Sequence, residues 1–371
     1  MERSLMFKCG VERLQVGRLG LGAIGAIGAI ALLSGPAAAQ FTPSDPLQAP
    51  LLPSLDQQLA PQLNNGTRGE LRDRADLFMG EAANQVRRGF QRKAIALWEQ
   101  AFDLYRKAGD TQGMGLSLDY IGLTYADLGL MVPAEDALRR RLAIARDRGD
   151  VQSQVYALNN VGTVLMKRGF APEAEKTFQE ARQIARDIRH LEGQGLSLSN
   201  LGLAAARQGE QGRAVKLYES ALAFRRQTRD AVGEANTLNN LGDAYQALGL
   251  YPDAVGTYGS ALSLARRSLD QTNQFRAIDG LVIAHRDAGR DTRALDLLDT
   301  RLQIAREQDN LRQQFVAVRS LAEFYQGNGN EVAAKNFYQR ALLLAQALGD
   351  RIEEVRLVDQ ITQIDFPNLV R

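Results

Sequence analysis

The stretch "LNNLGDAYQALGLYPDAVGTYGSALSLAR", residues 238–266, has a looser copy, "LNNVGTVLMKRGFAPEAEKTFQEARQIAR", at residues 158–186. An offset of 40 residues aligns the chain with itself seven times between about Leu71 and Asp350. Self-similarity at such a fixed period is the signature of a repeat protein, in which each unit buries its apolar side on its neighbours. The sequence therefore predicts seven stacked units over residues 71–350 in place of one globular core.

Three columns of residues recur with this period and keep the same phase. The glycine column comprises Gly89, Gly129, Gly169, Gly209, Gly249, Gly289 and Gly329. The alanine column comprises Ala94, Ala134, Ala174, Ala214, Ala254, Ala294 and Ala334. The column of large apolar residues comprises Trp98, Leu138, Phe178, Tyr218, Tyr258, Leu298 and Tyr338. Three columns in one register define a structural unit.

Each unit carries the pattern of two amphipathic helices separated by a glycine. In one unit the apolar residues at helical spacing are Leu238, Leu241 and Tyr245 before Gly249, and Ala254, Tyr258, Ala261 and Leu262 after it. Glycine ends a helix at least cost, because it adopts the left-handed conformation without a clashing Cβ. We expect the two helices to lie antiparallel, with Gly242 facing Ala254, while the large column fills the gap to the next unit.

At Leu241, Gly242, Tyr245, Ala254, Tyr258 and Ala261 the chain resembles the tetratricopeptide repeat. The usual repeat of that family has about 34 residues, and the 40-residue period is similar to the longer repeats of kinesin light chains and many bacterial repeat proteins. The resemblance implies an all-α fold, a right-handed superhelical α-solenoid of about seven helix-turn-helix repeats. Residues 351–365 continue the phase with Ile352, Val355, Val358 and Ile361, so we expect a capping helix and tail over residues 351–371 that closes the array.

The first 39 residues have the layout of a secretory signal peptide. Residues 1–18 carry four basic side chains, residues 19–35 are uncharged, and the small residues Ala37 and Ala39 follow. We expect cleavage after Ala39 and export to the periplasm or the medium of a bacterium. The alternative is an uncleaved segment whose residues 19–35 anchor the protein in a membrane, although these residues are few for a span of roughly 20.

Residues 40–70 contain five of the ten prolines and show no sustained helical periodicity. This composition predicts an extended Pro-rich linker. A second interpretation is that its apolar residues Leu51, Leu52 and Leu55 dock on the body or on another protein.

Charge and residue content disfavour several classes of function. The chain has 45 Lys plus Arg and 43 Asp plus Glu, and residues 1–39 hold the whole excess, so the exported body is neutral. Nucleic-acid binding needs a basic surplus, and we expect no nucleic-acid partner. The only histidines are His190 and His285, and the only cysteine, Cys9, lies in the segment to be removed. We therefore expect no catalytic residue, metal, cofactor or small-molecule substrate, and we interpret His285 as a core residue.

The candidate site is the surface that a curved helical array presents along its concave wall. On the first helix of one unit, the stripe beside the core comprises Asn236, Asn239 and Asp243, and Asp279 belongs to the same stripe one unit later. Asparagine recurs at or beside this stripe although it is a mediocre helix former. The recurring residues are Asn159, Asn160, Asn200, Asn239 and Asn240. The resemblance implies that they hold the backbone of an extended peptide, and the alternative is that they join neighbouring units.

These observations favour an exported, non-enzymatic scaffold or adaptor that binds a protein or peptide segment in its groove. The alternative is a regulatory or sensor module that a partner controls and that acts on a separate enzyme, such as a protease. A membrane is a partner only if the signal segment remains uncleaved.

Overall fold

The computed structural model describes residues 69–87 and 90–366. The regular elements in this part of the chain are fifteen α-helices, arranged as first and second helices of successive units. The first helices are α2 (Glu70–Arg87), α4 (Thr111–Asp127), α6 (Val151–Lys167), α8 (Leu191–Arg207), α10 (Ala231–Ala247), α12 (Gln271–Asp287) and α14 (Leu311–Gly327). The second helices are α3 (Gln91–Ala108), α5 (Met131–Asp147), α7 (Ala171–Asp187), α9 (Gln211–Thr228), α11 (Tyr251–Arg267), α13 (Asp291–Glu307) and α15 (Glu331–Leu348). One further helix, α16 (Arg351–Asp365), follows them.

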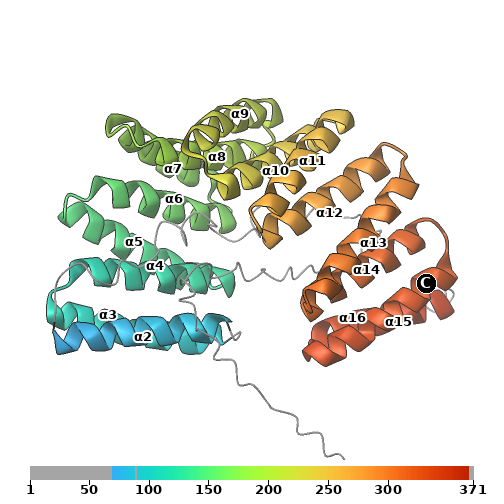
Figure 1. Cartoon of the computed structure of the whole chain (residues 1–371), viewed down its shortest axis with the longest axis horizontal. Helices are drawn as coiled ribbons and strands as arrows, with labels where there is room; N and C mark the ends of the chain where they lie inside the picture. The colour runs from blue at the N-terminus through green and yellow to red at the C-terminus, as the bar shows by residue number, and fades with distance from the viewer. Residues whose placement is uncertain (1–68, 88–89, 367–371) are drawn as a thin grey trace, which may run out of the picture.

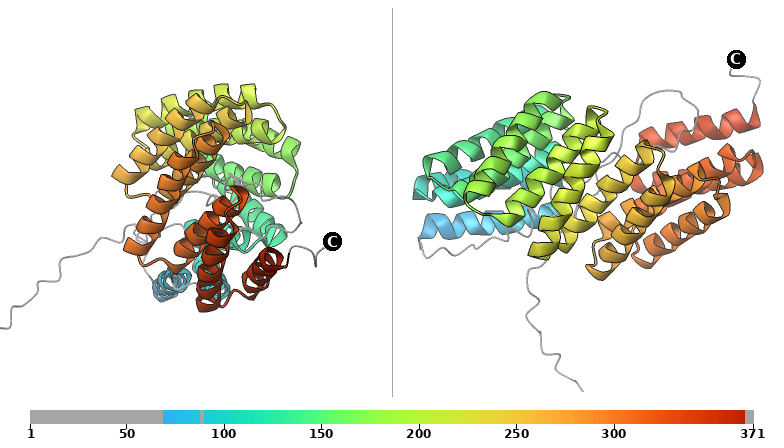
Figure 2. Two further views of the ribbon diagram at one scale, coloured as in Figure 1. Left: turned by 90° about the vertical axis from the view of Figure 1, so that its right-hand side faces the viewer. Right: turned by 90° about the horizontal axis from the view of Figure 1, so that it is seen from above.

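Consecutive helices pack against each other along the whole series, and together they form an arch (Figure 1). The two side views show that the helix pairs follow an open curve and step along its axis (Figure 2). The predicted all-α solenoid of seven helix pairs with a last single helix is therefore confirmed. None of the described helices combines the length and the apolar character that crossing a bilayer requires. The predicted signal peptide, residues 1–39, and nearly all of the predicted linker lie outside the described residues.

The turn inside each unit depends on the glycine column. Gly249, between α10 and α11, has φ +73°, and its amide donates to the carbonyl of Gln246 in the last turn of α10. This left-handed conformation is the one that glycine adopts without steric cost. The column therefore fixes where the chain reverses and makes the two helices antiparallel.

The glycines inside the first helices face the large column of their own unit, and Gly122 also lies against the backbone of Ala134, as expected. A Cβ on Gly242 would lie 2.6 Å from Cε1 of Tyr258, and a Cβ on Gly202 would lie 2.6 Å from Cε1 of Tyr218. A Cβ on Gly162 would likewise collide with the ring of Phe178. The glycine thus makes room for a ring from the second helix of its own unit. Packing of glycine on alanine alone would bring the two helix backbones closer together but would leave no space for the rings between them.

Short polar side chains join the first helices of consecutive units. The amide of Asn159 on α6 donates to Ser197 on α8 at 3.0 Å, and Asn239 on α10 donates to Asn273 on α12 at 3.1 Å. Ser199 and Thr237 form the corresponding bond between α8 and α10, 3.2 Å long.

Ion pairs join neighbouring second helices. Arg146 on α5 reaches Glu180 on α7 over 2.8 Å, and Arg213 on α9 reaches Glu175 on α7. Ion pairs are not restricted to the second helices, because Arg276 on α12 also pairs with Asp243 on α10.

Most first helices begin with an acidic or amide side chain that caps the helix. Asp230, for example, accepts a hydrogen bond from the amide of Gly233, and Asn310 accepts one from the amide of Gln313. In α8 the capping residue is His190, whose Nδ1 accepts from the amide of Gly193 at 3.1 Å. Only an imidazole with an unprotonated Nδ1 can accept this bond.

Replacement of Gly242 by Ala should destabilise the protein by about 1 to 3 kcal/mol, because the new methyl group overlaps the ring of Tyr258. The matched control is Gly256→Ala in α11, where a Cβ would meet no atom within 4 Å. That change should stabilise the helix by roughly 0.5 to 1 kcal/mol. Urea denaturation followed by circular dichroism measures both. Equal effects of the two substitutions would contradict the packing described here.

Lowering the pH should lower the free energy of unfolding, because His190 becomes protonated. Burial lowers the pKa of this imidazole in the folded state, so the unfolded state binds more protons as pH falls through about 6.5. The contribution of neutral His190 to the free energy of unfolding is then fully present at neutral pH and is lost as the pH falls below about 6.5. The lost contribution includes the helix cap, which is worth about 1 kcal/mol. The variant His190→Asn keeps an acceptor that does not titrate. Denaturation midpoints at pH 7.5 and 5.5 should differ less for the variant than for the natural protein, and an equal difference would contradict the assignment.

Candidate functional site: the inner wall of the first helices

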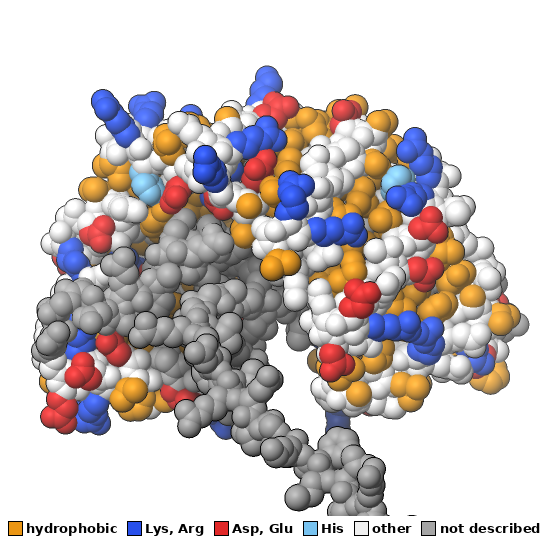
Figure 3. All heavy atoms as spheres, viewed as in Figure 1, with side chains coloured by type: hydrophobic (Ala, Val, Ile, Leu, Met, Phe, Trp, Pro, Cys, Tyr) orange, Lys and Arg blue, Asp and Glu red, His pale blue; other side chains and the backbone are white. Residues whose placement is uncertain are grey.

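The first helices line the concave side of the arch. Helix α6 contacts α8, α8 contacts α10, and α10 contacts α12, whereas no second helices of consecutive units contact one another comparably in the described chain. In a curved stack, elements at the smaller radius approach one another most closely, so this pattern places the first helices inside. On the face that Figure 3 shows, hydrophobic side chains and charged side chains of both signs are interspersed over the described helices.

On the first helices α4 to α14, two positions that are seven residues apart form the surface that we call the inner wall. Its members are Leu116 and Leu123 of α4, Tyr156 and Thr163 of α6, Leu196 and Leu203 of α8, Asn236 and Asp243 of α10, Arg276 and Ile283 of α12, and Val316 and Glu323 of α14. Residues spaced by seven lie on one helix face. The wall changes character along the stack, from mainly apolar on α4 to α8 to polar and charged on α10 to α14.

The apolar half is held together by contacts between successive first helices. Leu196 is buried, and Leu123 and Tyr156 pack against it in a small cluster separate from the main core. The Tyr156 ring also meets the ring of His190 edge-on, with centroids 5.5 Å apart. Burial, with the nearby Glu192 carboxylate, raises the pKa of the Tyr156 hydroxyl. At this end of the wall the accessible contact area comes from the partly buried Leu116, Leu123 and Tyr156, because Leu196 and Leu203 are buried.

The charged half centres on Arg276. Its Nη2 donates to Oδ1 of Asn240 at 2.5 Å and to Oδ2 of Asp243 at 2.7 Å. The hydroxyl of Tyr258 donates to the other oxygen of Asp243, and burial beside that carboxylate raises the pKa of Tyr258 well above its usual value. Nε and Nη1 of Arg276 have no hydrogen-bond partner in the described structure, although only 5% of the residue is exposed. Buried donors of this kind are normally paired.

Four of the predicted site residues are buried between units. Asn159 and Asn239 are fully inaccessible to solvent. Oδ1 of Asn159 accepts a hydrogen bond from Asn200. The amides of Asn159 and Asn239 donate to side chains of the next unit, as described above. Asn160 is buried beside the carboxylate of Asp119 of the preceding unit, and Asn240 accepts from Arg276 of the following unit. These contacts favour the alternative in which the asparagines join units. A role of these four in peptide binding stays a prediction.

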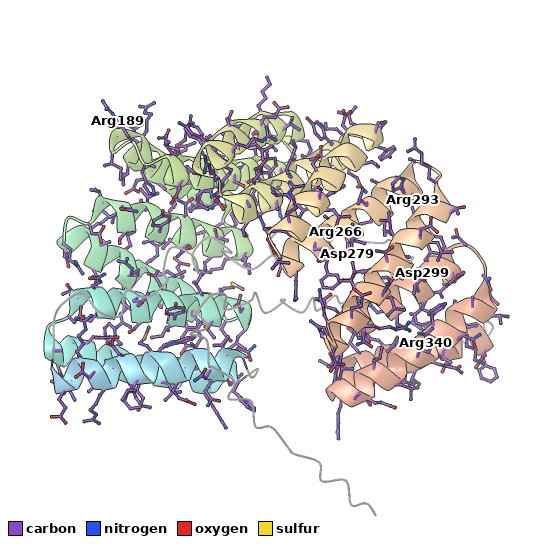
Figure 4. The ribbon with its side chains drawn as sticks, viewed as in Figure 1. Arg189, Arg266, Asp279, Arg293, Asp299 and Arg340 are labelled. Atoms are coloured by element: carbon purple, nitrogen blue, oxygen red, sulfur yellow. The ribbon has the colours of Figure 1, made fainter. Side chains whose placement is uncertain are left out.

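The other four predicted residues keep part of their surface accessible. They are Asn200, Asn236, Asp243 and Asp279. Asn236 makes one long contact, in which Asn240 donates to its Oδ1 at 3.5 Å. Asp279 lies on the inner side of α12, whereas Arg189 and Arg293 lie at the outer edge of the arch (Figure 4). Asn236 is therefore the predicted residue whose amide is least committed to the fold.

A buried arginine, Arg301 on α13, holds Asp279 and was missed by the sequence analysis. Its Nε donates to Oδ1 of Asp279 at 2.6 Å, and its Nη1 and Nη2 donate to Gln313 on α14 at 3.1 Å. Arg141 pairs with Asp119 in the same way. The sequence did carry a signal, because each arginine follows its aspartate by 22 residues and replaces an alanine found at that position in other units.

His285 lies in the core, with 8% of its surface exposed, and burial lowers its pKa. Over residues 69–87 and 90–366, no group of three or more His, Cys, Asp or Glu side chains is placed to hold a metal ion. The contacts that dominate the site are thus hydrogen bonds and apolar packing.

Comparison with known proteins agrees with this fold. Residues 153–227 and 233–307 match the sequence profile of the tetratricopeptide repeat. No protein of curated function matches the sequence.

Several solved structures superpose on the chain. Aspartyl phosphate phosphatase F from Bacillus subtilis is 13% identical, with 79% of this chain and 73% of that chain covered and a TM-score of 0.56. A Rap protein in complex with competence and sporulation factor is 14% identical, with 82% and 84% covered and a TM-score of 0.56. The apo form of the quorum sensor NprR from B. thuringiensis is 16% identical, with 83% and 91% covered and a TM-score of 0.51. At these identities the likeness extends to the fold alone.

The chain therefore carries tetratricopeptide repeats at residues 153–227 and 233–307, and the same 40-residue period and stacked helix pairs continue on both sides of them.

Proposed function

We propose that the protein binds an extended segment of another protein along its inner wall and performs no chemistry of its own. The observation that carries this proposal is the buried guanidinium of Arg276, which pairs with Asp243 through Nη2 while its Nε and Nη1 lack acceptors in the described chain. A peptide carbonyl or a carboxylate would supply an acceptor. The half-buried amide of Asn236 and the carboxylate of Asp243 lie on the same wall, and the carboxylate of Asp279 lies beside it on α12.

The geometry of the wall sets the length and the chemistry of the bound segment. Packed helices lie roughly 10 Å apart, and an extended chain advances about 3.3 Å per residue. One first helix therefore serves about three residues of the ligand. The segment should carry apolar side chains where it crosses α4 to α8, at Leu123, Tyr156 and Leu196, and polar or charged ones where it crosses α10 to α14.

A regulatory module is the second candidate. One of the similar structures, the quorum sensor NprR, supports it. In this case the bound segment controls how the array acts on a separate enzyme. The two candidates share the inner wall and differ in the partner, which is a structural neighbour for a scaffold and a single enzyme for a sensor.

Substitution of Asn236 by Tyr should weaken the binding of the partner segment by about tenfold or more, because the ring occupies the wall and removes a free amide. The fold tolerates the change, since Tyr156 occupies the same position in α6. The comparison variant is Asn239→Ala, which should lower stability by about 1 to 3 kcal/mol because it breaks a buried bond between units. Calorimetric binding and thermal melting separate the two effects.

The partner segment itself can be obtained by placing a photoactivatable benzoyl-phenylalanine at Tyr156 in the producing cell. The control carries the same group at Val132, an exposed residue of the second helix α5. Adducts that map to one extended segment from Tyr156, and that diminish in the Asn236→Tyr background, support the proposal. Equal adducts from both positions, or unchanged binding by Asn236→Tyr, would contradict it.

We also propose that residues 1–39 direct export and are then removed, as the basic start, the apolar stretch and the small residues at Ala37 and Ala39 support. Protein recovered after fractionation of the producing bacterium should begin at Gln40 on N-terminal sequencing and should lie outside the cytoplasm. Recovery from the membrane with residues 1–39 intact would favour the anchored alternative. Recovery of the intact chain from the cytoplasm would contradict export.

A further inference from the structure

The last helix, α16, has apolar residues on two opposite faces. One face packs on the core through the buried Leu357, with Ile361 and Ile364 partly buried beside it. The other face carries Ile352, Val355 and Val358, whose exposed fractions are 54%, 62% and 48%. At 100° per residue these three occupy an arc of about 120° centred on Val355, roughly opposite Leu357. The predicted helix is present, and its outer face is apolar and exposed in the described chain.

The repeat register explains why this face is apolar. Val355 and Val358 occupy the same positions as Phe315 and Val318 of α14, which are 1% and 2% exposed. In the interior units, the second helix that follows packs against these positions. Helix α16 is thus the first helix of an eighth unit, and no second helix covers it in the described chain. An apolar helix face left in this way normally has a partner.

The charges that flank the stripe are complementary to themselves in an antiparallel arrangement. Arg351 lies four residues before Val355 and Asp359 lies four residues after it, and both are exposed. If two α16 helices pack antiparallel about a two-fold axis at Val355, Arg351 of each copy meets Asp359 of the other. In the same register Ile352 meets Val358, and Val355 meets its own copy. Antiparallel packing also sets the two helix dipoles favourably.

We propose that the exposed face of α16 binds α16 of a second copy of this chain, so that two arches join at their C-terminal ends through an isologous contact. Each copy then covers the apolar face of α16 that no second helix covers in the described part of the chain. One pair of short helices buries less area than a standard interface of about 1,600 Å², so we expect dissociation on the order of micromolar concentration. The inner walls stay free, because α16 follows the last pair of the stack.

Sedimentation equilibrium of the full chain over a range of concentrations tests this dimer. The natural protein should pass from monomer to dimer, and Val355→Asp should remain monomeric, because two carboxylates would meet at the axis. The control is Val332→Asp on α15, where the valine is 75% exposed and lies outside the stripe. It should associate as the natural protein does. A natural protein that is monomeric at all concentrations, as it would be if another segment of the chain covered α16, would overturn the proposal.

Charge reversal tests the register separately from the apolar contact. Arg351→Glu and Asp359→Arg should each lower the association constant by about tenfold or more, because like charges then meet across the axis. The double variant, Arg351→Glu with Asp359→Arg, restores the pairing with reversed signs and should associate within about threefold of the natural protein. Circular dichroism should show equal helix content in all four proteins. A double variant as weak as the single ones would overturn the antiparallel arrangement.

Discussion

The ring of Tyr258 lies between two glycines, Gly242 of its own unit and Gly280 of the next, and a Cβ on either glycine would collide with it. The rest of the structure depends on such packing of the large residues, because Tyr218, Tyr258, Leu298 and Tyr338 lie in one core cluster that continues across the units. The polar bonds between first helices then set how closely the inner side of the stack can approach. Curvature, and with it the inner wall, follows from the two together.

Much of the fold could be predicted because the same requirements for turns and packing recur seven times along the chain. Two features recur at fixed positions: a glycine at which the chain reverses, such as Gly249, and a large side chain that needs space, such as Tyr258. The pattern of each unit therefore supports the structure predicted for the others. The partner of Gly242 could not be predicted in the same way. Both an alanine and a tyrosine recur in the facing helix, and only the rotation of the two helices about their axes decides which one meets the glycine.

The candidate site was harder to predict, because the sequence stripe beside the core contains both groove residues and residues between units. Asn159 and Asn239 fall on the boundary of that stripe, and a small rotation of each helix puts them inside the stack. Arg301 acts from the second helix, where a search of the first helices does not find it. The exposed valines of α16 reproduce the apolar pattern of buried units, so the sequence pattern alone indicated a closed end.

The central claim is that the units are stable only by stacking on one another, and arrays shortened by whole units test it most directly. Chains that end after Asp350, Asn310 and Asp270 remove α16 and then one helix pair at a time. The urea midpoint should fall at each step, because every removal deletes one interface between units. A midpoint that stays at the value of the full chain, or an isolated pair such as residues 231–270 that folds with the same stability, would contradict the account.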